Sequence, residues 1–199
     1  MSVEARDGTR LRVRPIEPWD KDLLRRTLER MSDDSRYRRF FAPVGTVREA
    51  DLAYLTEVDH HDHEALVALE PETGDAIGVA RFVRNADDPR SAEVAVAVVD
   101  DWQAHGIGRG LLEMLADRAR EENVTHFTAL VQGDNRAAID VLSKLGVTER
   151  MNAGPDTQLV IELPVDSGLG AGLAASLRAA AAKAIDAVPL AERLRRLRP

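Results

Sequence analysis

Residues 98–112 constrain this chain more than any other stretch of its sequence. They read V-V-D-D-W-Q-A-H-G-I-G-R-G-L-L and follow a run of small and β-branched residues, 92–99, that is typical of a buried strand. Apolar residues then recur at helical spacing, at Leu111, Leu112, Leu115 and Ala119. Glycines let a backbone approach a ligand closely, and a helix N-terminus presents unpaired N–H groups with a partial positive charge. The order strand, glycine loop, helix therefore predicts an anion-binding cradle.

The glycine spacing excludes two common phosphate-binding motifs. A dinucleotide fingerprint needs G-x-G-x-x-G, but Leu111 and Glu113 stand where the third glycine would fall, counted from Gly106 and Gly108. The G-K-[ST] of a Walker loop is absent. The loop instead reads Q-x-x-G-x-G over residues 103–108. A glycine-containing turn between a strand and a helix, without any ligand, is the alternative.

The hexapeptide resembles the pyrophosphate loop of the GNAT acyltransferases, whose backbone amides hold the diphosphate of acetyl-CoA. A second stretch, residues 135–147, is similar to the N-x-x-A-…-K-x-G-F pattern of the same family, matched at Asn135, Ala138, Lys144 and Gly146. In the family the asparagine contacts the pantetheine arm. The resemblance thus implies acetyl-CoA as cosubstrate, bound by Val98, Gln103, His105, Gly106, Ile107, Gly108, Arg109, Gly110 and Asn135.

Three of these residues have alternative roles. Asn135 suits the N-cap of the helix that follows it, a role compatible with ligand contact. Arg109 is equally typical of a phosphate partner and of a solvated helix surface. We expect His105 to flank the phosphates through its backbone alone.

Glu93 is the candidate catalytic residue. It stands in S-A-E-V-A-V-A-V, and charged residues avoid buried strands. An amine must lose a proton before it attacks a thioester, and burial would raise the pKa of a carboxyl toward working pH. In the GNAT family, notably in the bacterial protein-lysine acetyltransferases of the Pat type, a glutamate at this place is the general base. A strand-end carboxylate facing solvent is the alternative.

Three stretches near the N-terminus also resemble the Pat subgroup. They are R-P-I-x-P-x-D at 14–20, M-S-x-x-S-R-Y-R-R-F-F at 31–41 and A-L-V-A at 65–68. One position departs from the family: Leu142 replaces the tyrosine that many GNAT enzymes carry seven residues after the asparagine as general acid. The thiolate would then take its proton from water or from the reacting amine.

The resemblance implies an N-acetyltransferase acting on a primary amine, either a protein lysine or a small-molecule amine, by direct attack in a ternary complex. The chain has no cysteine, which excludes a thiol-based ping-pong route. A catalytically weak GNAT-fold module that binds CoA as a sensor or scaffold is the alternative, favoured by the missing tyrosine.

Periodicity predicts an α/β fold, and the resemblance makes it the GNAT fold: a mixed central sheet of about six to seven strands flanked by helices, over residues 1–163. Expected strands lie at 9–16, 65–69, 76–83, 92–99, 125–131 and 157–163. Expected helices include 20–31, 32–41 and the segments after Gly106 and Asn135.

Residues 164–199 are expected to form a C-terminal helical extension. It carries an alanine-rich segment and then a leucine stripe at Leu190, Leu194 and Leu197 opposite arginines. Helices this short need a surface, which favours docking at a homodimer contact. A frayed tail and a basic segment on an anionic membrane are the alternatives.

Composition limits the remaining partners. A net charge of −7 argues against nucleic acid, and no stretch approaches the roughly 20 apolar residues of a membrane span. The N-terminus does not resemble a signal peptide, and the lack of cysteine agrees with a cytoplasmic location. His60, His61 and His63 are spaced irregularly for a metal site, so no metal is expected and a substrate-facing role is preferred for their loop.

Overall fold

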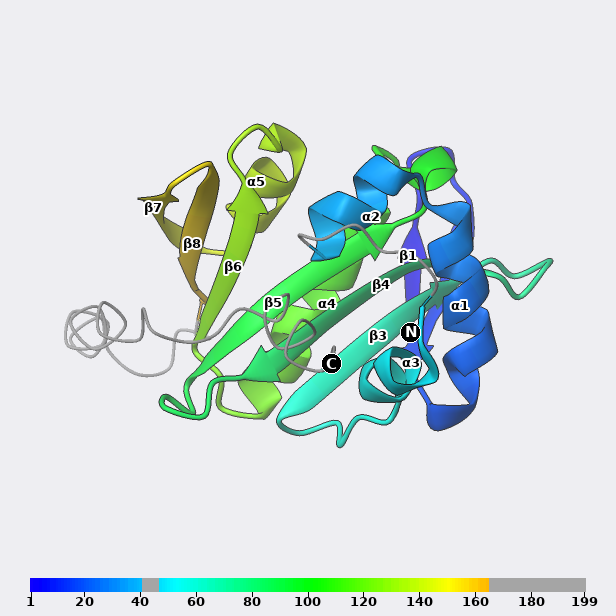
Figure 1. The fold of residues 1–199 in the computed structure, drawn as a ribbon, viewed down its shortest axis with the longest axis horizontal. Helices are drawn as coiled ribbons and strands as arrows, with labels where there is room; N and C mark the ends of the chain where they lie inside the picture. Colours follow the sequence, from blue (N-terminus) through cyan, green and yellow to red (C-terminus); the bar gives the residue numbers. More distant parts are fainter. Residues whose placement is uncertain (41–46, 165–199) are drawn as a thin grey trace.

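The computed structural model describes residues 1–40 and 47–164. Within them, one mixed sheet runs in the order β1-β2-β3-β4-β5-β6-β8-β7 (Figure 1). The strands are β1 (Ser2–Glu4), β2 (Arg10–Pro15), β3 (His63–Leu69), β4 (Ala76–Arg84), β5 (Ser91–Val98), β6 (His126–Gln132), β7 (Val147–Ala153) and β8 (Asp156–Glu162). The helices are α1 (Lys21–Arg30), α2 (Asp33–Phe40), α3 (Glu49–Thr56), α4 (Ile107–Glu121) and α5 (Arg136–Leu142), with single 3-10 turns at Pro18–Asp20 and Asp100–Trp102.

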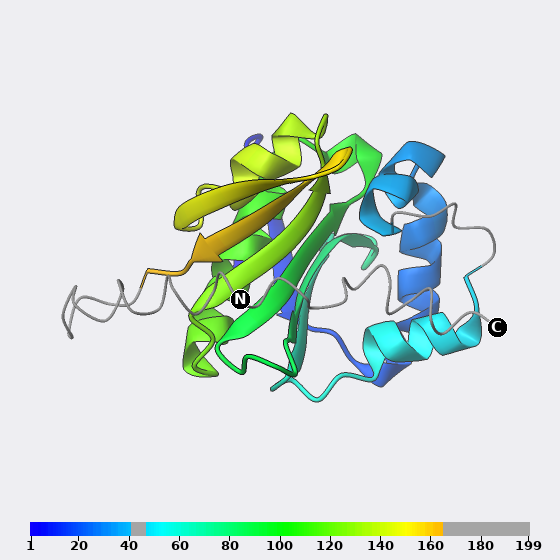
Figure 2. The same cartoon turned by 60° about the vertical axis from the view of Figure 1, so that its left-hand side comes forward.

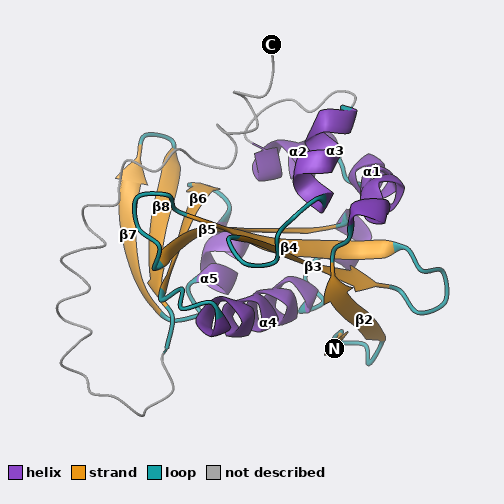
Figure 3. Ribbon diagram, turned by 90° about the horizontal axis from the view of Figure 1, so that it is seen from below, coloured by secondary structure: helices purple, strands orange, loops and turns teal. Residues whose placement is uncertain are grey.

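Helices cover both faces of the sheet. Figure 3 shows α1, α2 and α3 on one face and α4 and α5 on the other. The central strands β3 and β4 are therefore buried on both sides, which explains why their sequences are nearly continuous runs of apolar residues. The amphipathic helix α4 places Leu111, Leu112 and Leu115 in the core against this sheet, all three fully buried.

Strands β5 and β6 separate part-way along their length. They pair in parallel at only three positions, from Ser91↔His126 to Glu93↔Thr128. Beyond that point β5 stays paired with β4 and β6 stays paired with β8. Figure 1 shows the two strands diverging from their shared end. The edge of β5 from Val94 to Val98 thus has no strand beside it among the described residues, although a buried backbone needs hydrogen-bond partners.

The predicted α/β architecture is confirmed, with most bounds correct to within one or two residues, but the strand count is too low. The sheet has eight strands rather than six to seven. Two strands, β1 and β7, lie outside the six expected ranges, and β1 has only three residues, which pair with β2 from Ser2↔Arg12 to Glu4↔Arg10. Three residues are too few to show a period of two, so tertiary pairing alone defines this strand. The predicted C-terminal extension, residues 164–199, lies outside the described residues from 165 onward.

Strand β1 packs directly onto the first turn of α4. A Cβ atom added to Gly110 would lie 2.2 Å from Cγ2 of Val3 and 3.3 Å from its Cβ. Val3 is itself buried, at 7% exposure. Gly110 is therefore required where the strand and the helix meet, whatever its role toward a ligand.

Replacing Gly110 with alanine should destabilise the protein. The added methyl group overlaps a stiff valine side chain, so we expect the free energy of unfolding to fall by about 1–3 kcal/mol, measured in urea. The matched control is Gly108→Ala on the same helical turn, because its added Cβ would make only ordinary contacts, at 3.5 Å to Val98 Cγ2. Adding Val3→Ala should recover part of the loss, and equal stabilities of the two glycine variants would contradict this packing.

Candidate active site

The loop between β5 and α4 is shaped by two residues with left-handed backbone conformations. Ala104 has φ 62° and Gly106, the N-cap of α4, has φ 88° and ψ −6°. Gly106 adopts this conformation without strain, whereas Ala104 is a rare non-glycine example. Alternating backbone handedness of this kind turns successive N–H groups toward one point, a geometry that binds anions.

The first turn of α4 continues this array of donors. The first intrahelical hydrogen bond runs from the Gly110 N–H to the Gly106 carbonyl at 3.0 Å. Helix geometry therefore leaves the N–H groups of Ile107, Gly108 and Arg109 without intrahelical acceptors, at the positive end of the helix dipole. The Gly110 amide is already used, so among the predicted ligand residues it has the least to offer through its backbone.

Most side chains of the loop are engaged with the protein itself. The Gln103 amide Nε2 donates to the Val98 carbonyl at 3.2 Å, closing the loop onto the end of β5. The His105 ring is 2.8 Å from the Gln103 carbonyl, and Ile107 is buried in the core at 1% exposure. This leaves the backbone as the main functional surface of the loop.

Arg109 is exposed and forms an ion pair with Glu113, with 2.7 Å between its Nε and a carboxylate oxygen. This arrangement is the solvated helix-surface role, one of the two alternatives given for Arg109 above. A contact between Arg109 and a phosphate stays a prediction. Trp102 is partly buried beside the same loop, with its ring centre 6.1 Å from that of His105.

Asp100 ties the loop to helix α2. Its carboxylate accepts hydrogen bonds from the Ser32 N–H at 2.8 Å, the Ser32 hydroxyl at 2.9 Å and the Ser35 hydroxyl at 2.7 Å. Gln103 Nε2 donates to the same Ser35 hydroxyl at 3.1 Å. Burial alone would raise the pKa of Asp100, but the hydrogen bonds from Ser32 and Ser35 outweigh it and lower that pKa. The anion loop and α2 are therefore one connected unit.

Asn135 and Leu142 lie on the other side of the divergence, after β6. The Asn135 side-chain oxygen accepts from the Ala138 N–H at 3.2 Å, so the residue is the N-cap of α5. Leu142, at the position of the expected tyrosine, is buried in the core at 4% exposure. The described residues therefore provide no side-chain acid at that position.

Glu93 lies at the point where β5 and β6 separate. It forms the last parallel pair, with Thr128, and lies opposite Val83 of β4. It is the third residue of β5 and is only partly exposed, so it is not a solvated carboxylate at the end of a strand. It shares its sheet face with Ala97, which places it on the side covered by α1, α2 and α3, and Arg39 of α2 is close enough to interact with it electrostatically.

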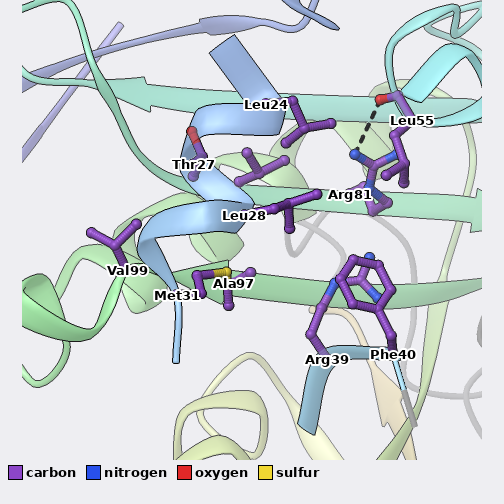
Figure 4. Close-up of a pocket in the computed structure, with 11 residues that line it drawn as sticks. Leu24, Thr27, Leu28, Met31, Arg39, Phe40, Leu55, Arg81, Ala97 and Val99 are labelled. Carbon is purple, nitrogen blue, oxygen red and sulfur yellow. Dashed lines mark hydrogen bonds between the residues drawn. The ribbon is translucent and has the colours of Figure 1, made fainter. Parts of the chain in front are cut away.

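A small pocket, open to solvent, lies on this face of the sheet (Figure 4). Its walls are mostly apolar and come from α1, α3, β4 and β5, with Leu28, Met31 and Val79 among them. Among the described residues, Arg39 of α2 and Arg81 of β4 are the charged ones that line it. Neither arginine was predicted as a site residue from the sequence. Arg81 nevertheless carried a signal, because it is the one charged residue within A-I-G-V-A-R-F-V at 76–83, just as Glu93 is in β5.

The three histidines at the start of β3 and just before it contact different partners. Nδ1 of His60 is 2.8 Å from Glu64, His61 contacts Glu122, and Nε2 of His63 is 3.1 Å from Arg81. Within residues 1–40 and 47–164, no three histidine or acidic side chains converge as metal ligands. Only His63 contacts a residue of the pocket.

Replacing Asp100 with asparagine should weaken the junction between the loop and α2. An amide accepts more weakly from three donors, so we expect about 1 kcal/mol less stability at pH 7. The pKa of Asp100 is lowered by folding, so its contribution is present above its unfolded-state pKa and disappears as the pH falls through the lower folded-state pKa. The stability gap between variant and parent should therefore close below about pH 4. Asp101→Asn, at the exposed neighbour, should show no gap at either pH in urea unfolding.

Comparison with known proteins agrees with this geometry. Residues 21–147 match the acetyltransferase (GNAT) family. The chain is 37% identical over 166 residues to "Acetyltransferase Pat" of Mycolicibacterium smegmatis, covering 83% of this chain and 50% of that protein. It therefore spans about half the length of this curated relative.

Two solved structures extend the comparison. The GNAT domain of PAT from S. lividans aligns with a TM-score of 0.76 at 32% identity, covering 82% of this chain and 96% of that one. The yncA protein of Salmonella typhimurium, solved with its cofactor acetyl-CoA, has the same fold with a TM-score of 0.58 at 20% identity, covering 81% and 98%. In the part of this chain that the structure describes, no helix is long and apolar enough to cross a membrane. By the family match over most of its length and by these relatives, the chain belongs to the GNAT acetyltransferase family.

Proposed function

We propose that this protein transfers an acetyl group from acetyl-CoA to a primary amine. The observation that carries the proposal is the position of Glu93 at the point where β5 leaves β6, on the strand that leads directly into the anion-binding loop. A cosubstrate lying along the free edge of β5 would bring its thioester close to this carboxylate. Membership of the GNAT family supports the same reading.

The residues present fit acetyl-CoA as a ligand. The diphosphate would be held by the backbone N–H groups at Gly106, Ile107, Gly108 and Arg109. The pantetheine arm, which carries amides, would pair with the strand edge at 94–98, where no strand competes for hydrogen bonds. Asn135 caps α5 on the opposite side of this divergence and is the proposed side-chain contact to the arm. Bound acetyl-CoA would supply an activated acetyl thioester.

Glu93 is proposed to take the proton of the attacking amine. An ammonium group is unreactive, so the base must act before or during attack. The amine nitrogen then bonds to the acetyl carbon, the carbon–sulfur bond breaks, and the electron pair leaves with the thiolate. Backbone N–H groups of residues 94–98 would polarise the thioester carbonyl. With Leu142 in place of a tyrosine, the thiolate takes a proton from water or from the amine.

The acceptor is a protein lysine or a small-molecule amine in this proposal, and a homodimer through residues 164–199 is part of it. A CoA-binding module without turnover is the second candidate, favoured by the buried Leu142. Release of CoA thiol with a panel of amines and lysine peptides separates the two candidates.

Acetyl-CoA should raise the melting temperature of the protein, since a ligand that binds only the folded state stabilises it. Gly108→Asp introduces a negative charge among the proposed diphosphate donors and should abolish this rise while the protein stays folded. Gly74→Asp, in the turn between β3 and β4, is the control and should respond like the parent. An undiminished shift in Gly108→Asp would refute binding at this loop.

Glu93→Gln should lower kcat by about 10²–10⁴, the range for loss of a positioned base, and leave the acetyl-CoA melting shift intact. Glu149→Gln, on the exposed strand β7, controls for loss of one negative charge and should retain full activity. Normal turnover by Glu93→Gln would assign the base to another group.

A further inference from the structure

The pocket beside Glu93 contains a buried positive charge, Arg81, whose hydrogen-bond partners among the described residues include no carboxylate. Arg81 is 2% exposed, and its guanidinium donates to His63 Nε2 and to the Leu55 carbonyl, each at 3.1 Å. Because a guanidinium can only donate, His63 must be unprotonated at that nitrogen. Leu55 lies at the C-terminal end of α3, whose dipole offsets part of the charge.

Arg39 adds a second positive charge to the same pocket. It comes from the last turn of α2, and its guanidinium carbon lies 5.0 Å from the centre of the Phe40 ring. Figure 4 shows Arg39 and Arg81 entering the pocket from α2 and β4. Among residues 1–40 and 47–164, no carboxylate lies within 4 Å of either guanidinium. Buried charges are normally paired, so this arrangement is costly as it stands.

The free-energy cost of holding these charges in the pocket lowers the pKa of both guanidinium groups. Burial lowers the pKa of Arg81 to about 9, and the charge of Arg39 lowers it in the same direction. Burial also lowers the pKa of Arg39 to about 10, while Glu93 and Tyr54 act in the opposite direction. Both side chains remain protonated at neutral pH, so the pocket keeps two positive charges.

Small side chains flank Arg81 on its face of the sheet. Its neighbours across β3 and β5 on the same face are Ala65 and Ala95, which have minimal side chains. Glu93 stands two residues before Ala95 on β5 and is diagonal to Arg81, a separation of about 7–8 Å along the sheet. One face of the sheet thus presents a carboxylate and, beside it, two guanidinium groups.

We propose that the acceptor is an amine that also carries a carboxylate, and that Arg39 and Arg81 bind this carboxylate while the amine faces Glu93. The proposal rests on the acetyltransferase function proposed above and names the class of its acceptor. The shared chemistry is an aminocarboxylate, either a free amino acid or a lysine with an acidic residue beside it in a polypeptide. Ion pairing in the pocket would compensate both arginines and orient the amine.

The first experiment measures kcat/KM at saturating acetyl-CoA for matched acceptors. Each free aminocarboxylate, with one to five carbons between amine and carboxylate, is compared with its neutral carboxamide. A second arm compares lysine peptides with glutamate or glutamine beside the lysine. We expect the carboxylate to be preferred by about 10- to 100-fold in one arm, the worth of charge-assisted hydrogen bonds. The arm in which the carboxylate is preferred shows whether the acceptor is a free aminocarboxylate or a lysine beside an acidic residue.

Variants then assign the preference to the arginines. Arg39→Gln should reduce the ratio of kcat/KM between carboxylate and carboxamide to within about threefold of one, chiefly by raising KM for the carboxylate. Arg26→Gln, at an exposed arginine of α1, removes the same charge and should keep the ratio. Arg81→Lys retains charge without the forked donor and should lower the ratio less than Arg39→Gln. A full preference in Arg39→Gln would overturn the assignment.

A binding measurement separates this proposal from the catalytic one. N-acetylated carboxylates and their carboxamides are titrated calorimetrically into the full chain with CoA present. Preferential binding of the carboxylate, lost in Arg39→Gln, supports the subsite even if no acceptor is turned over, and in that case only the acetyltransferase proposal fails. Equal affinity for both, together with equal turnover in both arms, would overturn the subsite and leave acetyl transfer unaffected.

Discussion

The separation of β5 from β6 after Glu93 is the constraint on which the rest of the site depends. A parallel ladder of three pairs holds the strands at one end, and longer antiparallel ladders to β4 and β8 hold them apart beyond it. Among the described residues, no strand therefore pairs with this edge of β5 from 94 to 98, where only the Val98 carbonyl accepts from Gln103. Since buried backbone groups need partners, a ligand with peptide-like amides is the natural complement to this edge.

Two helix N-termini and a carboxylate are positioned by this one divergence. The loop after β5 leads into α4, and the loop after β6 leads into α5, so their first turns lie on either side of the opening. Glu93 occupies the vertex on the face that α1, α2 and α3 cover. Asp100 fixes α2 to the anion loop through Ser32 and Ser35, so the helix that carries Arg39 is mechanically continuous with the proposed diphosphate site. A ligand bound at the loop and a ligand bound in the pocket would therefore contact parts of the fold that these hydrogen bonds join.

The charge distribution of the pocket opposes that of the whole chain. The protein carries a net charge of −7, yet the described residues that line the pocket include two arginines and no acid. Elsewhere in the fold, buried ions are paired. The Asp20 carboxylate accepts hydrogen bonds from Nη1 and Nη2 of Arg14, and Glu64 accepts one from Arg118. Against that background, two arginines without a carboxylate within 4 Å among the described residues are better explained by the binding of an anionic group than by stability.

The sequence by itself determined the order of elements, the glycine loop and the identity of Glu93 as an unusual strand carboxylate. These features are local: the periods of 2 and 3.6 and the special backbone conformations of glycine are written in short segments. It also identified Asn135 as an N-cap, because that role needs only the residue three positions ahead. The sequence did not predict strand β1, because three residues carry no period. It did not predict the packing of Val3 on Gly110 either, because these two residues are distant in the chain.

Only the tertiary structure decided how the site is assembled. The point at which β5 and β6 part depends on competing ladders with β4 and β8, and no short segment encodes it. Asp100 meets Ser32 across 68 positions of sequence, and Arg39 reaches the same pocket as Arg81 from a different element. Arg81 could be recognised as an isolated charge in an apolar strand, but its lack of a carboxylate partner could not. Whether a buried charge is paired depends on every element packed around it, and that is fixed only when the chain has folded.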